Sequence, residues 1–136
     1  MHKRFVLAIA LATTLVPALA RSADSQYSVK IDAPPAQVGK EGRAQVRVLP
    51  GQGMHVNVEY PASILLSLPP GIEGPSGKLK PTKLDKNAAS FEVGFTPYEP
   101  GAKVFSAVVS FAVCDDALTQ CNPRREKVQF TVNVSK

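Results

Sequence analysis

The chain contains two cysteines, Cys114 and Cys121, and six residues separate them near the C-terminus. Two thiols at this spacing can close a structural disulfide, or they can exchange electrons with the thiols of a partner. The residues on both sides have strand-like patterns, so the cysteines are expected near the ends of a hairpin, within disulfide reach. Cys114 and Cys121 therefore form the candidate site, either as a redox pair or as a structural disulfide.

The residues beside the two cysteines differ in charge. The acidic pair Asp115-Asp116 directly follows Cys114 and disfavours a thiolate there. The basic pair Arg124-Arg125 follows Cys121 and favours its thiolate. If one sulfur acts as the nucleophile, these charges predict that it is Cys121. The acidic pair itself suits a turn better than acid–base chemistry.

Outside the first few residues, His55 is the only histidine. It is expected on the polar face of a strand, together with Asn57 and Glu59. One histidine cannot build a histidine-rich metal centre, and the cysteines are expected to bond to each other rather than to zinc. No G-x-S-x-G motif supports a serine nucleophile. We therefore expect no metal site and no cofactor, and the residues leave open whether the chain is an enzyme.

The N-terminus has the three parts of a secretory signal peptide. Charged residues at 2–4 precede an apolar run from Phe5 to Val16, and Ala18-Leu19-Ala20 is an A-x-A cleavage site. The apolar run is too short to span a bilayer, so no stable membrane insertion is expected after cleavage. Residues 1–20 are therefore predicted to be a signal peptide that is cleaved after Ala20, and the mature protein is expected to be periplasmic or secreted.

The predicted mature chain, residues 21–136, has the size of a single domain. Without Lys3 and Arg4 it carries 14 basic and 11 acidic side chains, a formal net charge of +3. So small an excess gives no support to a nucleic-acid partner in an exported protein. Export also makes a disulfide the default state of the two cysteines, because the compartment is oxidising.

Apolar and polar residues alternate along most of the mature chain, at the period of two that is typical of half-buried strands. Glycine and proline interrupt this pattern roughly every ten residues. No stretch after residue 20 keeps helical spacing over three turns. The sequence therefore predicts an all-β fold, an antiparallel β-sandwich of about seven or eight strands. The expected strands are 27–31, 43–48, 54–60, 64–68, 90–95, 104–113 and 125–134.

Two segments have a distinctive composition. The run 104–113 carries few charges on either face, so it is predicted to lie centrally in its sheet, antiparallel to its neighbour 125–134. A disulfide across their connection closes an eight-residue loop, which is worth about 2.5 kcal/mol in the chain-entropy model. The segment Lys78–Lys86 holds four lysines and is expected to be a solvated loop or an edge strand.

The segment from Tyr98 to Val134 resembles the end of the N-terminal periplasmic domain of the thiol:disulfide interchange protein (DsbD) family. The shared features are, in order, an aromatic-led strand with Phe111, Cys114, a short acidic loop, Cys121, a proline-containing pair and a final strand. Family members usually carry tyrosine at the position of Phe111 and a diproline after the second cysteine.

The resemblance implies an immunoglobulin-like fold and a partner-binding module that takes part in thiol–disulfide exchange. In that family the second cysteine reacts with the partner, and the matching residue here is Cys121. The implied partner is an exported thioredoxin-like protein or another periplasmic protein, because a lone domain must take its electrons from elsewhere. The alternative is a structural or adhesive β-sandwich module in which the Cys114–Cys121 disulfide is only a clip. The reduction potential of the pair distinguishes the two.

Overall fold

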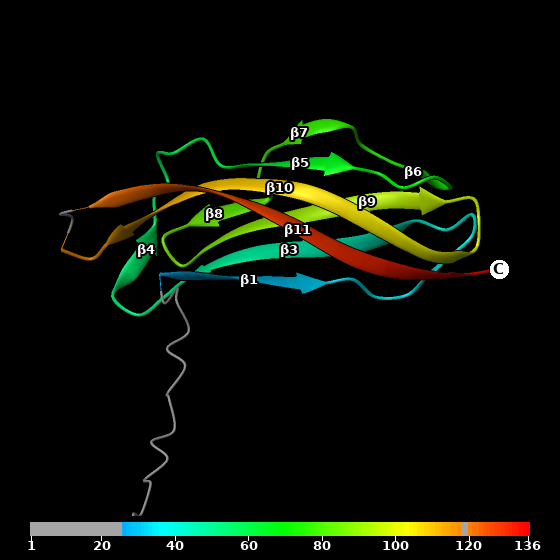
Figure 1. Cartoon of the computed structure of the whole chain (residues 1–136), viewed down its shortest axis with the longest axis horizontal. Coiled ribbons are helices and arrows are strands. Elements are labelled where there is room, and N and C mark those ends of the chain that lie inside the picture. Colours follow the sequence, from blue (N-terminus) through cyan, green and yellow to red (C-terminus); the bar gives the residue numbers. More distant parts are fainter. Residues whose placement is uncertain (1–25, 118–119) are drawn as a thin grey trace, which may run out of the picture.

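The computed structural model describes residues 26–117 and 120–136, and within these ranges the protein is an all-β sandwich of two sheets (Figure 1). The predicted signal peptide, residues 1–20, lies outside the described residues. In the part of the chain that is described, no helix is long and apolar enough to cross a membrane.

The strands of both sheets pair antiparallel, apart from the short parallel pair of β2 with the end of β11. The first sheet has the order β1 (Tyr27–Asp32), β3 (Gly42–Pro50), β9 (Ala88–Pro97) and β6 (Ile72–Glu73), and β8 (Lys83–Asp85) also pairs with β9. The second sheet has the order β2 (Ala36–Gln37), β11 (Cys121–Ser135), β10 (Gly101–Asp115), β5 (Ser63–Ser67) and β7 (Gly77–Leu79), and β4 (Met54–Val56) also pairs with β10.

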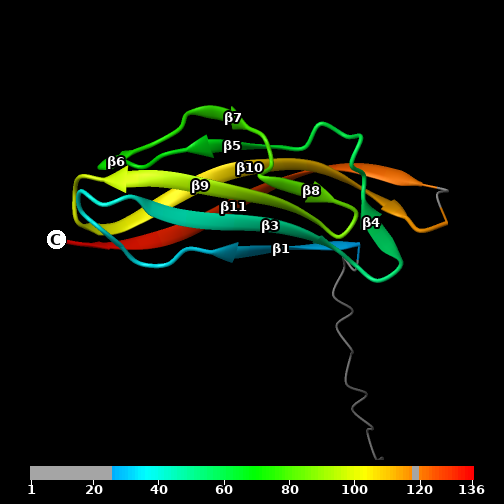
Figure 2. The same cartoon turned by 180° about the vertical axis from the view of Figure 1, so that it is seen from behind.

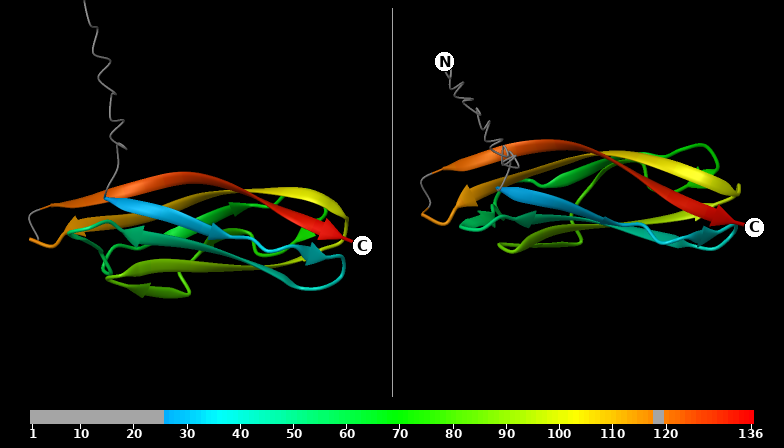
Figure 3. Two further views of the ribbon diagram at one scale, coloured as in Figure 1. Left: turned by 90° about the horizontal axis from the view of Figure 1, so that it is seen from below. Right: turned by 60° about the horizontal axis from the view of Figure 1, so that its bottom comes forward.

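The two sheets lie face to face. In the view from behind, β3 and β9 lie in front of β10 and β11, and β1 runs along the lower edge (Figure 2). Figure 3 shows the layers from the side, with β1 of the first sheet beside β11 of the second. Side-chain hydrogen bonds join the sheets at this edge, where Tyr27 donates to Glu126 and Arg124 donates to Gln26 over 3.0 Å.

The core lies between the sheets, and alternate residues of the long strands fill it. The ring of Phe105 is fully buried and lies 5.0 Å from that of Phe95 and 4.9 Å from that of Phe130, measured between centroids. Burial of each such side chain contributes about 1.5–3 kcal/mol. The predicted period of two is thus confirmed, and so is the fold class, an all-β, immunoglobulin-like antiparallel β-sandwich. The buried residues of β10 that face this core are Phe105, Ala107, Val109, Phe111 and Val113.

Strand β10 lies in the middle of its sheet, as its low charge predicts. It pairs with β11 from Gly101 to Cys114, and on its other side with β5 and then β4. The pairing of β10 and β11 as antiparallel neighbours is therefore confirmed. This hairpin positions the two cysteines at one end of the sandwich.

The predicted strand 54–60 is too long, because β4 ends at Val56. The side-chain oxygen of Asn57 accepts a hydrogen bond from the backbone N–H of Glu59 over 3.0 Å, which closes a turn directly after the strand. Val58, which the alternation placed beside Val56 in the core, is instead 45% exposed. The local side-chain hydrogen bond of Asn57 overrides the apolar alternation here.

The lysine-rich segment Lys78–Lys86 contributes short strands at the margins of both sheets, in agreement with the predicted edge location. Strand β7 is the last strand in its sheet, and β8 pairs only with β9 among the described strands. The turn between β8 and β9 is closed by Asp85, whose carboxylate accepts the backbone N–H groups of Asn87 and Ala88 at 2.8 and 3.0 Å. The hydrogen bond from Asn87 is the main cause that holds the pKa of Asp85 below its usual value.

Candidate functional site

The two cysteines form a disulfide at the end of the β10–β11 hairpin, as predicted. Cys114 and Cys121 are direct partners in the register, and their Cα atoms lie 4.0 Å apart. The next pair outward is hydrogen-bonded, since the N–H of Asp115 donates to the carbonyl of Gln120 over 3.0 Å. Cys114 and Cys121 therefore occupy a non-hydrogen-bonded position, where antiparallel strands approach each other most closely.

Strand β11 begins at Cys121 itself, so the strands extend further toward the disulfide than the sequence predicts. Pro123 does not interrupt the strand, because it is paired with Ala112. Hydrogen-bonded and non-hydrogen-bonded pairs alternate, so the nitrogen of Pro123 faces away from β10. A proline at that position removes no hydrogen bond from the ladder, as is usual for proline at a sheet edge.

The two halves of the disulfide differ in exposure. Cys114 lies between β11 and β4 and is only 3% exposed. Cys121 is the first residue of β11, at the opposite end from the pairing with β2, and is exposed. Of the two residues, Cys121 is therefore the one that a thiolate in solution could approach.

Arg124 does not lie beside the sulfur of Cys121. Side chains on a strand alternate between its two faces, so Arg124 and Cys121 point to opposite faces. The Arg124 guanidinium instead donates to Gln26 at the edge of the sandwich. Arg125 shares the face of Cys121 but follows it by four residues, about 13 Å along the strand. The exposure of Cys121, and not the positive charge of Arg124 or Arg125, therefore distinguishes Cys121 from Cys114 as the more accessible cysteine.

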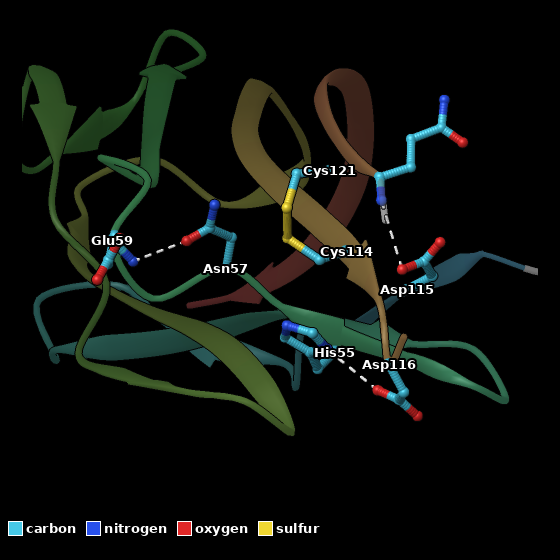
Figure 4. Close-up of a disulfide and its surroundings, with 8 residues drawn as sticks. His55, Asn57, Glu59, Cys114, Asp115, Asp116 and Cys121 are labelled. Carbon is cyan, nitrogen blue, oxygen red and sulfur yellow. Dashed lines mark hydrogen bonds and ion pairs between the residues drawn. A yellow bond between two sulfur atoms is a disulfide. The ribbon is translucent and has the colours of Figure 1, made fainter. Parts of the chain in front are cut away.

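A shallow groove of about 280 Å³ lies against the disulfide. Strand β4, the turn that follows it, and the β8–β9 turn enclose this groove together with the hairpin end. Figure 4 shows the disulfide with His55 and Asn57 beside it. The residues that line the groove are His55, Val56, Asn57, Val58, Glu59, Lys86, Cys114 and Cys121.

His55 is the lining residue of this groove that lies beside Cys114 in the sheet. It pairs with Cys114 in the register of β4 and β10, so the two side chains share a face. The Nδ1 atom of His55 lies 3.0 Å from a carboxylate oxygen of Asp116, and the histidine side chain is only 17% exposed. The sequence placed His55 on a polar face with Asn57 and Glu59 and assigned Asp116 to a turn, so it missed the contact between them. No local pattern signals that contact, because 61 residues separate the two.

No protein-family model and no curated protein sequence matches the chain. Similar solved structures include the CARDB domain of a protein from Pyrococcus furiosus, at 21% identity and a TM-score of 0.43, over 80% of this chain and 94% of that one. AggA, the major subunit of aggregative adherence fimbriae type I from Escherichia coli, matches at 11% identity with the same TM-score and coverage. A PapD-like domain of a human protein matches at 10% identity and a TM-score of 0.37, over 96% and 100% of the two chains. These likenesses are too distant to carry an argument about function.

Proposed function

We propose that this protein is an exported, partner-binding β-sandwich domain that exchanges disulfides for thiols through Cys114 and Cys121. The observation that carries the proposal is the unequal environment of the two sulfurs. Cys121 is exposed at the start of β11, and Cys114 is buried beside a groove that His55 also lines. Exchange requires one sulfur that a thiolate can reach and one that can leave.

The hairpin does not depend on the disulfide for its register. Strands β10 and β11 are paired over 14 successive positions, of which Cys114–Cys121 is the last. The loop that the bond closes is short, so its expected contribution to stability is only about 2.5 kcal/mol. Because the disulfide is not needed for the register of the hairpin and lies at an accessible end, it is available for thiol–disulfide exchange.

The partner we propose is an exported thioredoxin-like protein or another periplasmic protein with a dithiol or disulfide of its own. The resemblance to the DsbD family supports this partner class, and the disulfide is typical of proteins that fold in oxidising compartments. Residues 21–136 would then act as one domain after removal of residues 1–20.

N-terminal sequencing of the exported protein is expected to begin at Arg21, and a sequence that begins at Met1 would contradict export by this signal.

The reduction potential of the Cys114–Cys121 pair tests the proposed exchange. Structural disulfides typically have potentials below about −300 mV, whereas exchange-competent pairs are more oxidising. We expect a value above that limit when the protein is equilibrated with glutathione or dithiothreitol redox buffers. A value below it would leave the disulfide as a structural clip in an adhesive or scaffolding module.

A trapping experiment tests which sulfur reacts. The Cys114→Ala variant leaves Cys121 free, and the Cys121→Ala variant is its matched control with Cys114 free. We expect the first variant to form mixed disulfides with a thioredoxin-like protein at least about tenfold faster, because Cys121 is the exposed residue. Equal rates for the two variants would show that Cys121 is not the preferred reactive sulfur.

A further inference from the structure

We propose that His55 is the proton donor to the departing sulfur of Cys114, and that Asp116 is the residue that positions it. This inference rests on the proposed exchange function and assigns a role to a pair of residues outside the two cysteines. The arrangement runs across three strands, in the order Cys121, Cys114 and His55, and Asp116, directly after the end of β10, contacts the histidine (Figure 4).

The register places the imidazole on the same side as the leaving sulfur. His55 and Cys114 are direct partners on neighbouring antiparallel strands, so their Cβ atoms are about 5 Å apart and their side chains share a face. Both residues also line the groove beside the disulfide.

Asp116 fixes which ring nitrogen is available. A carboxylate accepts hydrogen bonds and does not donate, so His55 Nδ1 is the donor in the 3.0 Å contact with Asp116. In the imidazolium form the Nε2 atom also carries a proton, and this is the proton that Asp116 does not hold and that His55 can transfer. In Figure 4 the ring of His55 lies between the disulfide and the Asp116 carboxylate.

The reaction balances with a dithiol partner. A partner thiolate attacks Sγ of Cys121, a new disulfide forms between the partner and Cys121, and the Cys114–Cys121 bond breaks with its electron pair on Sγ of Cys114. His55 Nε2 transfers its proton to that sulfur and is later reprotonated from water. The second thiolate of the partner then attacks the partner's own sulfur in the mixed disulfide, and Cys121 leaves and takes a proton from water. The partner is thereby oxidised to a disulfide, and the cysteine pair is reduced to two thiols.

Reduction by excess dithiothreitol tests the role of His55. The second-order rate constant is followed by alkylation of the released thiols and mass measurement, for the wild type and for His55→Gln. Glutamine retains a hydrogen-bonding side chain but cannot transfer a proton in this way. We expect the variant to react about tenfold more slowly at pH 6. General acid catalysis generally contributes at least that much, and the effect is at the low end here because a thiolate is already a good leaving group.

The pH dependence separates proton transfer from a structural effect. The ratio of the two rate constants, wild type over His55→Gln, cancels the thiolate fraction of the reductant. It is expected to fall toward one by pH 9, because histidine side chains lose their proton between pH 5 and 8. The other charged groups around the imidazole are Asp116, Glu59 and Lys86, which both variants retain. A ratio that stays constant from pH 5.5 to 9 would overturn the proton-donor role.

Two aspartate variants form a matched pair. Asp115→Asn and Asp116→Asn each remove one negative charge close to Cys114, but only Asp116 contacts His55. If loss of charge were the only effect, it would stabilise the departing thiolate and both variants would react faster than the wild type. We expect Asp115→Asn to be faster than the wild type and Asp116→Asn to be about threefold slower. Acceleration of both would overturn the positioning role of Asp116.

The controls distinguish failure of this inference from failure of the exchange function. Urea unfolding of each oxidised variant checks that the fold is retained. If wild-type protein is reduced no faster than oxidised glutathione, both the exchange function and the role of His55 fail. If the wild type is reduced faster and His55→Gln matches it at every pH, only the role of His55 fails.

Discussion

Two hairpin turns meet at the same groove, and they are closed in different ways. The β8–β9 turn is closed by one carboxylate, Asp85, which accepts two backbone N–H groups. The β10–β11 hairpin is closed by a covalent bond between Cys114 and Cys121. The short β8–β9 pairing depends on its turn, because only three residue pairs hold it. The long β10–β11 pairing is held in register by its buried core residues, so it does not need the disulfide for that purpose.

The largest effect is expected from the core of the longer hairpin. Phe111 is fully buried, and its ring lies 4.9 Å from that of Tyr27 between centroids. Phe111→Ala is expected to lower the free energy of unfolding by about 3–5 kcal/mol, because it removes apolar burial and leaves a cavity. Urea denaturation of the oxidised protein measures this loss. Phe111→Leu keeps more of the volume, so a similar loss in that variant would show that cavity formation is not the cause.

A smaller effect is expected from removal of the disulfide. The double variant Cys114→Ala/Cys121→Ala should lose about 2.5 kcal/mol of unfolding free energy, from the closed loop of the chain-entropy model. The hairpin register should remain, with the Asp115 amide still protected from hydrogen exchange. A loss larger than that of Phe111→Ala would reverse the comparison, because the disulfide would then be what holds the hairpin.

The shorter hairpin is expected to respond locally. Asp85→Ala removes the acceptor for two amides, so hydrogen exchange at Asn87 and Ala88 should accelerate while the amides of β10 and β11 stay protected. The loss of global stability should be below that of the disulfide variant. Asp85→Asn retains a side-chain oxygen and is the matched control. Faster exchange along β10 would show that the two turns are coupled.

The smallest effect is the pH dependence of the same turn. The pKa of Asp85 is lowered in the folded protein, chiefly by the hydrogen bond from the Asn87 amide. Its contribution is therefore complete above the unfolded pKa, near 3.9 for aspartate in general, and is lost as pH falls through the lower folded pKa. The stability difference between wild type and Asp85→Asn should shrink below about pH 4. A difference that grows in acid would contradict the hydrogen-bonding role.

The sequence was a good guide to the strands and a poor guide to the site. Period-two alternation identifies β3, β9, β10 and β11 because each has one face against the core. It failed at Asn57, where a single side-chain hydrogen bond ends β4 earlier than the apolar pattern suggests. The disulfide was predictable because Cys114 and Cys121 are close in the sequence and lie on adjacent strands.

The neighbours of the disulfide were not predictable from local patterns. His55 reaches Cys114 only through the long-range pairing of β4 with β10. Arg124 is close to Cys121 in the sequence, yet the alternation of side chains on β11 directs it to the opposite face. Proximity in the sequence therefore misassigned the charges around the sulfur, whereas the register between strands assigns them correctly.

The position of Cys114 and Cys121 in the ladder determines what must move when their bond opens. Their backbones exchange no hydrogen bond with each other, and the adjoining bond from Asp115 to Gln120 is made by other residues. Opening the disulfide therefore requires the rotation of two side chains and breaks no backbone hydrogen bond of the sheet. If the pair exchanges disulfides as proposed, each cycle of reduction and oxidation would leave the backbone hydrogen bonds of the hairpin intact.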